Sequence, residues 1–146
     1  MCDDSAAELE DIEPELKTRP EVIAVRVGIY GALQRWPEMA MLARRLVEVE
    51  PEEAQGWIYL AYATRRAESI ETARNILLRA EERCPEEPMI KFNLACYACQ
   101  LGMLAEAKAY LTKAIRRAKC IRELALNDPD LEPLWDSLAV EWREGE

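Results

Sequence analysis

The chain has 146 residues, half of them apolar and 32% charged, a size that suits one domain with a modest core. Its 28 acidic residues outnumber its 19 basic ones, and the formal charge of -9 makes nucleic acid and anionic membranes poor partners. Histidine is absent, which excludes an imidazole-based triad and the histidine-containing zinc sites.

The composition favours helices and a location in the cytoplasm. Ala, Glu, Leu, Lys and Arg, which are strong helix formers, supply 79 of the residues. The mean hydropathy is -0.27, and no uncharged apolar run approaches the roughly eighteen residues of a membrane span. The N-terminus also lacks the basic and apolar regions of a secretory signal.

Proline positions and apolar periodicity predict seven helices after an acidic segment at residues 1–19. For that segment, a short helix packed on the first repeat competes with a disordered acidic tail. The helices are expected over residues 20–34, 37–49, 52–66, 69–83, 87–101, 104–124 and 130–143.

Local signals support these boundaries. Pro20 and Pro88 fall in first turns, where a missing N–H is harmless, and Ser69 is a suitable N-cap. Gly102 is expected to end a helix in a left-handed turn. The sixth helix is expected to run on to residue 124, because position 119 holds Lys119 and not a proline that would end the helix.

The chain repeats itself at an interval of 34 residues, the distance from Pro51 to Pro85. The same residue types recur at five fixed offsets from each proline, namely Leu60, Ala61, Ala73, Leu77 and Ala80, then Leu94, Ala95, Ala107, Leu111 and Ala114. In a weaker earlier unit Val27, Met39, Ala43 and Leu46 stand at four of these offsets, Ile23 corresponds to Trp57, and Arg26 replaces the leucine. A further start follows Pro129 with Trp135, Leu138 and Ala139. The small residues would let the two helices of a unit approach closely.

This spacing resembles the tetratricopeptide repeat, a 34-residue helix–turn–helix unit. The string Phe92-Asn93-Leu94-Ala95 is also similar to one common in that family. The resemblance implies an all-α, right-handed α-solenoid of antiparallel helix pairs, like that of small bacterial members, as a single domain over residues 20–143. Its repeats would lie at about 20–51, 54–85 and 88–125, followed by an extra C-terminal helix at 130–143.

In that family the first helix of each pair lines a concave groove that receives polypeptide segments. The resemblance therefore predicts a groove lined by Gln55, Ile58, Tyr59, Tyr62, Arg65, Arg66, Met89, Phe92, Asn93, Cys96 and Gln100. Its aromatic lining and paired arginines suit an apolar segment with an acidic end. For Tyr62, Phe92 and Asn93, packing between helices is the competing role. Of the family's chaperone-binding clamp of lysines and asparagines, only Asn93 is present.

Cys96 and Cys99 have the C-x-x-C spacing of redox pairs and half metal sites. They fall within a predicted helix without a preceding strand or a second cysteine pair, so we expect them to pack as small apolar side chains. No metal site, cofactor or catalytic residue is predicted.

The sequence thus favours a non-enzymatic adaptor, scaffold or assembly factor that binds a protein or peptide. Two alternatives remain open at this stage. One is a chaperone of the type III secretion kind, and the other is a structural homodimer formed by end helices that carry Trp135 and Trp142.

Overall fold

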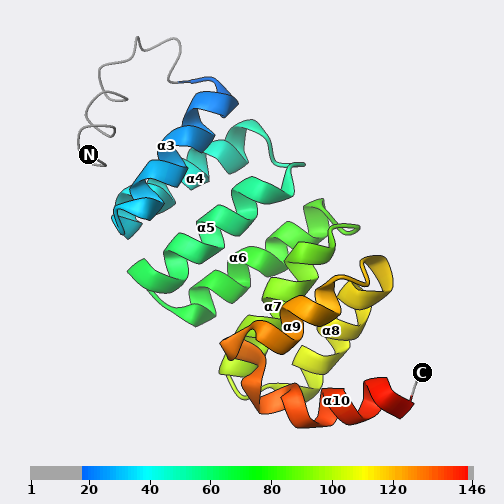
Figure 1. Cartoon of the computed structure of the whole chain (residues 1–146). Coiled ribbons are helices and arrows are strands. Elements are labelled where there is room, and N and C mark those ends of the chain that lie inside the picture. The colour runs from blue at the N-terminus through cyan, green and yellow to red at the C-terminus, as the bar shows by residue number, and fades with distance from the viewer. Residues whose placement is uncertain (1–17, 145–146) are drawn as a thin grey trace. The chain divides into compact units, whose positions relative to one another are not determined.

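The computed structural model describes residues 18–144, so the expectation for the acidic segment at 1–19 lies almost wholly outside the described residues. The chain divides into two compact units, one ending at Cys84 and the other beginning at Pro85. All described elements are helices (Figure 1), namely α3 (Pro20–Ala32), α4 (Trp36–Val49), α5 (Ala54–Ala67), α6 (Ile70–Arg83), α7 (Pro88–Gln100), α8 (Leu104–Arg117), α9 (Ile121–Asn127), the 3-10 helix η1 (Pro129–Leu134) and α10 (Trp135–Glu144). The expectation of one domain over 20–143 stays a prediction.

The first unit consists of two antiparallel helix pairs, α3 with α4 and α5 with α6, and α5 also packs along α4. In the second unit α7 pairs with α8 in the same way. The expected caps are present, since Ser69 accepts a hydrogen bond from the Thr72 N–H at 3.1 Å and Gly102 is left-handed with φ 79°. These features confirm an all-α repeat built from helix pairs.

The 34-residue interval corresponds to equivalent buried positions. Leu60 and Leu94 are 5% and 0% exposed, and the four alanines that follow or face them are fully buried (Ala61, Ala73, Ala95 and Ala107). The corresponding positions of the weaker first unit are buried as well, and its assignment as a repeat over about 20–51 stays a prediction. Alanine at the crossing of two helices removes the side-chain bulk that would hold them apart.

The turn between α4 and α5 is fixed from two sides. The buried Trp57 donates a hydrogen bond from its indole Nε1 to the Pro51 carbonyl oxygen at 2.8 Å. At the end of α6, Cys84 Sγ donates to the Glu52 carbonyl oxygen at 3.4 Å, and Arg83 forms an ion pair with the Glu52 carboxylate. The backbone that carries Glu50 and Glu53 is therefore held in place.

The expectation of one helix over 104–124 is wrong. The helix α8 ends at Arg117, Ala118 is extended (φ -146°, ψ 104°), and the chain turns before α9 begins. A 21-residue helix would be about 31 Å long beside α7, whose 13 residues span about 20 Å. Its last turns would then extend beyond α7, whereas the turn allows Ile121 and Ala125 to be buried.

The C-terminal helix expected over 130–143 differs at its start. Residues 129–134 form the 3-10 helix η1, and the α-helix begins at Trp135. Pro133 lies inside η1 and has no N–H to donate. A 3-10 helix also aligns side chains three residues apart, and Leu131 and Leu134 are both buried, at 0% and 3% exposure.

Two left-handed residues provide a paired stability test. We predict that Gly102→Ala lowers the free energy of unfolding by about 1 kcal/mol, because a Cβ strains this backbone conformation. No atom lies within 4 Å of the added Cβ, so the cost is conformational. Gln34, with φ 58°, should show the opposite sign, and Gln34→Gly should stabilise by a similar amount. Urea unfolding followed by circular dichroism checks both, and effects of the same sign would contradict the prediction.

Candidate functional site

The α5 helix leaves one stripe uncovered. It buries Trp57, Leu60, Ala61 and Thr64 against its neighbours. The six predicted groove residues of α5 lie on the remaining stripe, with Gln55, Tyr62 and Arg66 exposed and Ile58, Tyr59 and Arg65 half-buried. The neighbouring first helix, α3, adds small exposed residues such as Gly28. We call this side of the first unit the α3–α5 face.

Tyr62 is the centre of an aromatic and cationic cluster on this face. Its ring packs edge-on against Trp36, with the ring centroids 5.7 Å apart. The Arg66 guanidinium lies over both rings, 3.6 Å from the Tyr62 centroid and 5.2 Å from that of Trp36. Because 43% of the Tyr62 side chain remains exposed, this Tyr62 cluster offers a rigid aromatic surface beside a positive charge.

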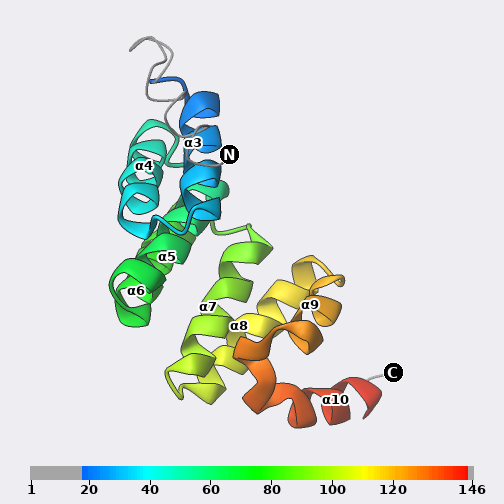
Figure 2. The same ribbon diagram turned by 60° about the vertical axis from the view of Figure 1, so that its left-hand side comes forward.

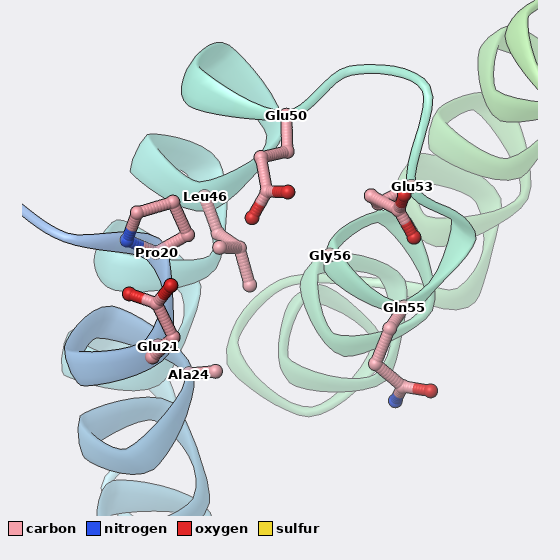
Figure 3. Close-up of a pocket in the computed structure, with 8 residues that line it drawn as sticks. All are labelled: Pro20, Glu21, Ala24, Leu46, Glu50, Glu53, Gln55 and Gly56. Atoms are coloured by element: carbon pink, nitrogen blue, oxygen red, sulfur yellow. The ribbon is translucent and has the colours of Figure 1, made fainter.

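A pocket lies near the other end of α5, between the starts of α3 and α5 (Figure 3). It encloses about 290 Å³, and its lining comprises Pro20, Glu21, Ala24, Leu46, Glu50, Glu53, Gln55 and Gly56. Figure 3 shows the Glu21 and Glu50 carboxylates on the side of α3 and α4, with Glu53 and Gln55 across from them at the start of α5. We call this the glutamate pocket.

The glutamate pocket depends on the close approach of α5 to α4. A Cβ on Gly56 would lie 3.3 Å from Leu46 Cγ, so glycine allows this spacing. None of the carboxylates of Glu21, Glu50 and Glu53 forms an ion pair with a cation of the described residues. The pocket therefore combines a small apolar floor with negative charge that is not neutralised by those residues.

The predicted residues of α7 are placed differently. Phe92 and Cys96 are 5% and 2% exposed, Met89 and Asn93 are half-buried, and only Gln100 is exposed. The cover comes from the same unit, because η1 packs against α7, as the orange segment in Figure 2 shows. The stripe of α7 that corresponds to the open stripe of α5 is thus occupied by the chain itself.

Polar contacts hold this cover in register. Cys96 Sγ donates to an Asp128 carboxylate oxygen at 3.6 Å, and Gln100 Nε2 donates to the Asp130 carbonyl oxygen at 2.8 Å. Trp135 Nε1 donates to the Ala125 carbonyl oxygen at 2.8 Å, which ties the start of α10 to α9. In the first unit, by contrast, the helix after a pair packs mainly on the second helix of that pair.

The cysteines of α7 are buried thiols, as expected, and Cys84, Cys96, Cys99 and Cys120 are outside disulfides. Burial and the Asp130 carboxylate raise the pKa of the Cys99 thiol. Ligand atoms of Cys96, Asp128 and Asp130 lie within 4.8 Å of one another, and within residues 18–143 no other three such groups converge. Structural zinc takes four ligands, so this set is one short of such a site.

Sequence reasoning missed Trp36, Glu21 and Glu50. Trp36 begins α4 and lies outside the periodic stripes, so no spacing relates it to Tyr62. Acidic residues near helix starts favour the helix dipole, and Glu21 lies in such a first turn. Because the helix dipole already explains such residues, the sequence does not reveal that glutamates from two helix starts and from the turn between them line one pocket.

None of the helices in the described part of the chain combines the length and apolarity that a membrane span requires. No protein-family model and no curated protein matches the sequence.

Solved structures match the fold. MamA MSR-1 superposes with a TM-score of 0.66 at 19% identity, covering 81% of this chain and 68% of that one. The type III secretion translocator chaperone SycD of Yersinia enterocolitica gives 0.63 at 17% identity, covering 94% and 96%. The TPR2AB domain of yeast Sti1, in its complex with pHSP90, gives 0.67 at 19% identity, covering 91% and 50%.

These likenesses define the class as a helical-repeat protein of antiparallel pairs. More narrowly, the chain has a tetratricopeptide-like fold, as the 34-residue interval predicts.

The packing of η1 on α7 can be tested by measuring how fast the Cys96 and Cys99 thiols are alkylated. We predict that Leu131→Ala, which removes a fully buried side chain of η1, increases the alkylation rates of Cys96 and Cys99 by iodoacetamide at least tenfold at pH 8. In the wild type, the alkylation rate of Cys99 should increase only at pH values above the usual titration range of a thiol, because the pKa of Cys99 is raised. The exposed Cys120 should react before the buried Cys84, Cys96 and Cys99 in all variants.

Leu111→Ala is the matched control, since it removes an equally buried leucine from α8. Mass spectrometry of the labelled peptides measures each site. If Leu111→Ala accelerates Cys96 and Cys99 as much as Leu131→Ala does, general destabilisation explains the labelling and the specific cover is disproved.

Proposed function

We propose that the chain binds a segment of another polypeptide along the α3–α5 face and acts as an adaptor, scaffold or assembly factor. The observation that carries the proposal is the contrast between corresponding stripes. Tyr62 in the α5 stripe is 43% exposed, whereas in α7, against which η1 packs, Phe92 and Cys96 are 5% and 2% exposed. Among the described residues of the first unit, nothing covers the α5 stripe in this way.

The side chains on this face suit binding rather than bond-making. Tyr62 and Trp36 present rigid aromatic surface at a low cost in conformational entropy, as interface anchors do. Arg66 is an exposed residue stacked on these rings, and its guanidinium can donate hydrogen bonds to a carboxylate of the segment. The fold likeness to an Sti1 domain solved with pHSP90 supports a polypeptide ligand. We place this activity in the cytoplasm and assign it no catalytic step or cofactor.

The proposed binding face includes fewer residues than the groove predicted from the sequence. Its α5 residues remain candidates for direct contact. On α7, Phe92 and Cys96 would become available only if η1 moved away, so we leave them out of the proposed binding face.

A secretion chaperone is the second candidate. It is favoured by the likeness to SycD, in which 94% of this chain and 96% of that one superpose. A partner that is exported by a secretion system would distinguish a chaperone from a resident adaptor. Self-association is a third possibility, and sedimentation of the purified chain tests it directly.

Affinity capture from native lysate tests the proposal. We predict that Tyr62→Ala combined with Arg66→Ala loses most of the partner signal recovered by wild type, because the aromatic anchor and its charge disappear together. Quantitative mass spectrometry of the captured proteins is the measurement, and circular dichroism checks the fold.

The matched control is Met41→Ala combined with Arg44→Ala, which removes an exposed apolar side chain and a cation from α4. This variant should retain the partners. Equal recovery by all three baits would show that the α3–α5 face does not bind them.

A further inference from the structure

The glutamate pocket adds a chemical requirement to the proposed binding face. We infer that it receives the side chain of a lysine or arginine from the bound segment. This inference rests on the proposed function and specifies which segments the face selects. It is carried by the pocket's shape and charge, which are independent of the Tyr62 cluster.

The lining matches the two parts of such a side chain. Pro20, Ala24 and Leu46 provide an apolar surface for an aliphatic stem. The carboxylates of Glu21, Glu50 and Glu53 surround it and can accept charge-assisted hydrogen bonds from an ammonium or guanidinium group. Gln55 adds an exposed amide at the rim.

The pocket is large enough to hold one long side chain. Its volume of about 290 Å³ is at the lower limit of small-molecule sites, which enclose roughly 300–1,000 Å³. A single metal ion fits less well, because the oxygens of the three glutamates are not within 4.8 Å of one another, unlike the ligand atoms at Cys96, Asp128 and Asp130.

Charge argues against an occupant from the chain itself. Residues 1–17 carry seven acids and one base, so this segment has the same sign as the pocket. A second copy carries a net charge of -9 and is repelled overall. A basic segment of a different polypeptide is the complementary ligand.

The pocket also sets a spacing. Gln55 at the pocket and Tyr62 lie seven residues apart on one helix, which is about 10 Å along its axis. An extended segment covers this distance in about three residues. A basic residue in the pocket would therefore place the residue three positions away beside Tyr62 and Arg66, where an acidic side chain is favoured.

Two hexapeptides test this requirement, Ac-Ala-Lys-Leu-Ala-Glu-Ala-NH2 and the same peptide with Gln in place of Lys. Each is titrated into the isotope-labelled full chain, and amide chemical shifts are followed by NMR. We expect the lysine peptide to shift resonances of residues 20–24 and 50–56 and to bind at least fivefold more tightly than the glutamine peptide. Glu21→Gln combined with Glu50→Gln should abolish this preference.

Glu48→Gln combined with Glu71→Gln is the matched control. It removes the same charge from exposed positions on α4 and α6 and should keep the preference, which separates the pocket from the overall field of an acidic protein. Loss of the preference in this variant would overturn the pocket assignment.

The remaining outcomes separate the two proposals. Equal affinity of wild type for both peptides, with binding lost in Tyr62→Ala, overturns the basic anchor and leaves the binding face intact. The absence of shifts in α3 and α5 with either peptide at millimolar concentration also overturns the anchor, while the affinity capture described above decides the binding face independently. Sedimentation that shows dimers dissociated by Glu21→Gln with Glu50→Gln would assign the pocket to a second copy and overturn the choice of ligand.

Discussion

Close helix contact through alanine is the constraint on which this structure depends. Ala61 and Ala73 in the first unit, and Ala95 and Ala107 in the second, are completely buried where the paired helices meet. Any larger side chain there would separate the helices, and the leucines that fill the adjacent space would lose their contacts. The small residues recur every 34 residues because each helix pair has this same packing requirement.

The exposed stripe of the proposed binding face follows from the same packing. The first helix of a pair packs one side against its partner helix. Because side chains project all around a helix with 3.6 residues per turn, a single layer of pairs leaves the opposite side unburied. In α5 the remaining side carries Tyr62, Arg66 and Gln55, whose positions are fixed by the burial of Trp57 and Leu60 on the other side. The buried side of α5 thus supports the backbone that carries the exposed side chains.

The sequence predicted the features that depend on local periodicity. The buried positions, the Ser69 cap and the left-handed Gly102 agree with the structure because each is determined by residues within one or two turns or by the repeat interval. The break after Arg117 was not predictable in this way, because Ile121 and Ala125 continue the apolar spacing of α8, and that spacing does not reveal the limited length of the neighbouring α7.

The candidate site shows the same division. The α5 stripe follows from spacing, but the glutamate pocket unites residues from α3, from the turn after α4 and from the start of α5, which share no sequence pattern. The burial of Phe92 and Cys96 depends on where η1 packs, and periodicity predicted neither the turn after Arg117 that leads into α9 nor the 3-10 form of η1. Sequence periodicity could not predict the contacts that irregular segments form after a turn.

The attachment of η1 to its own unit has a kinetic and thermodynamic consequence for α7. A segment joined to its site by a short connection experiences an effective concentration in roughly the millimolar range. A free competitor with equal contacts but at micromolar abundance would occupy α7 in only a small fraction of molecules. A ligand of α7 would therefore have to outcompete η1, whereas no described residue of the first unit covers the proposed binding stripe of α5 in this way.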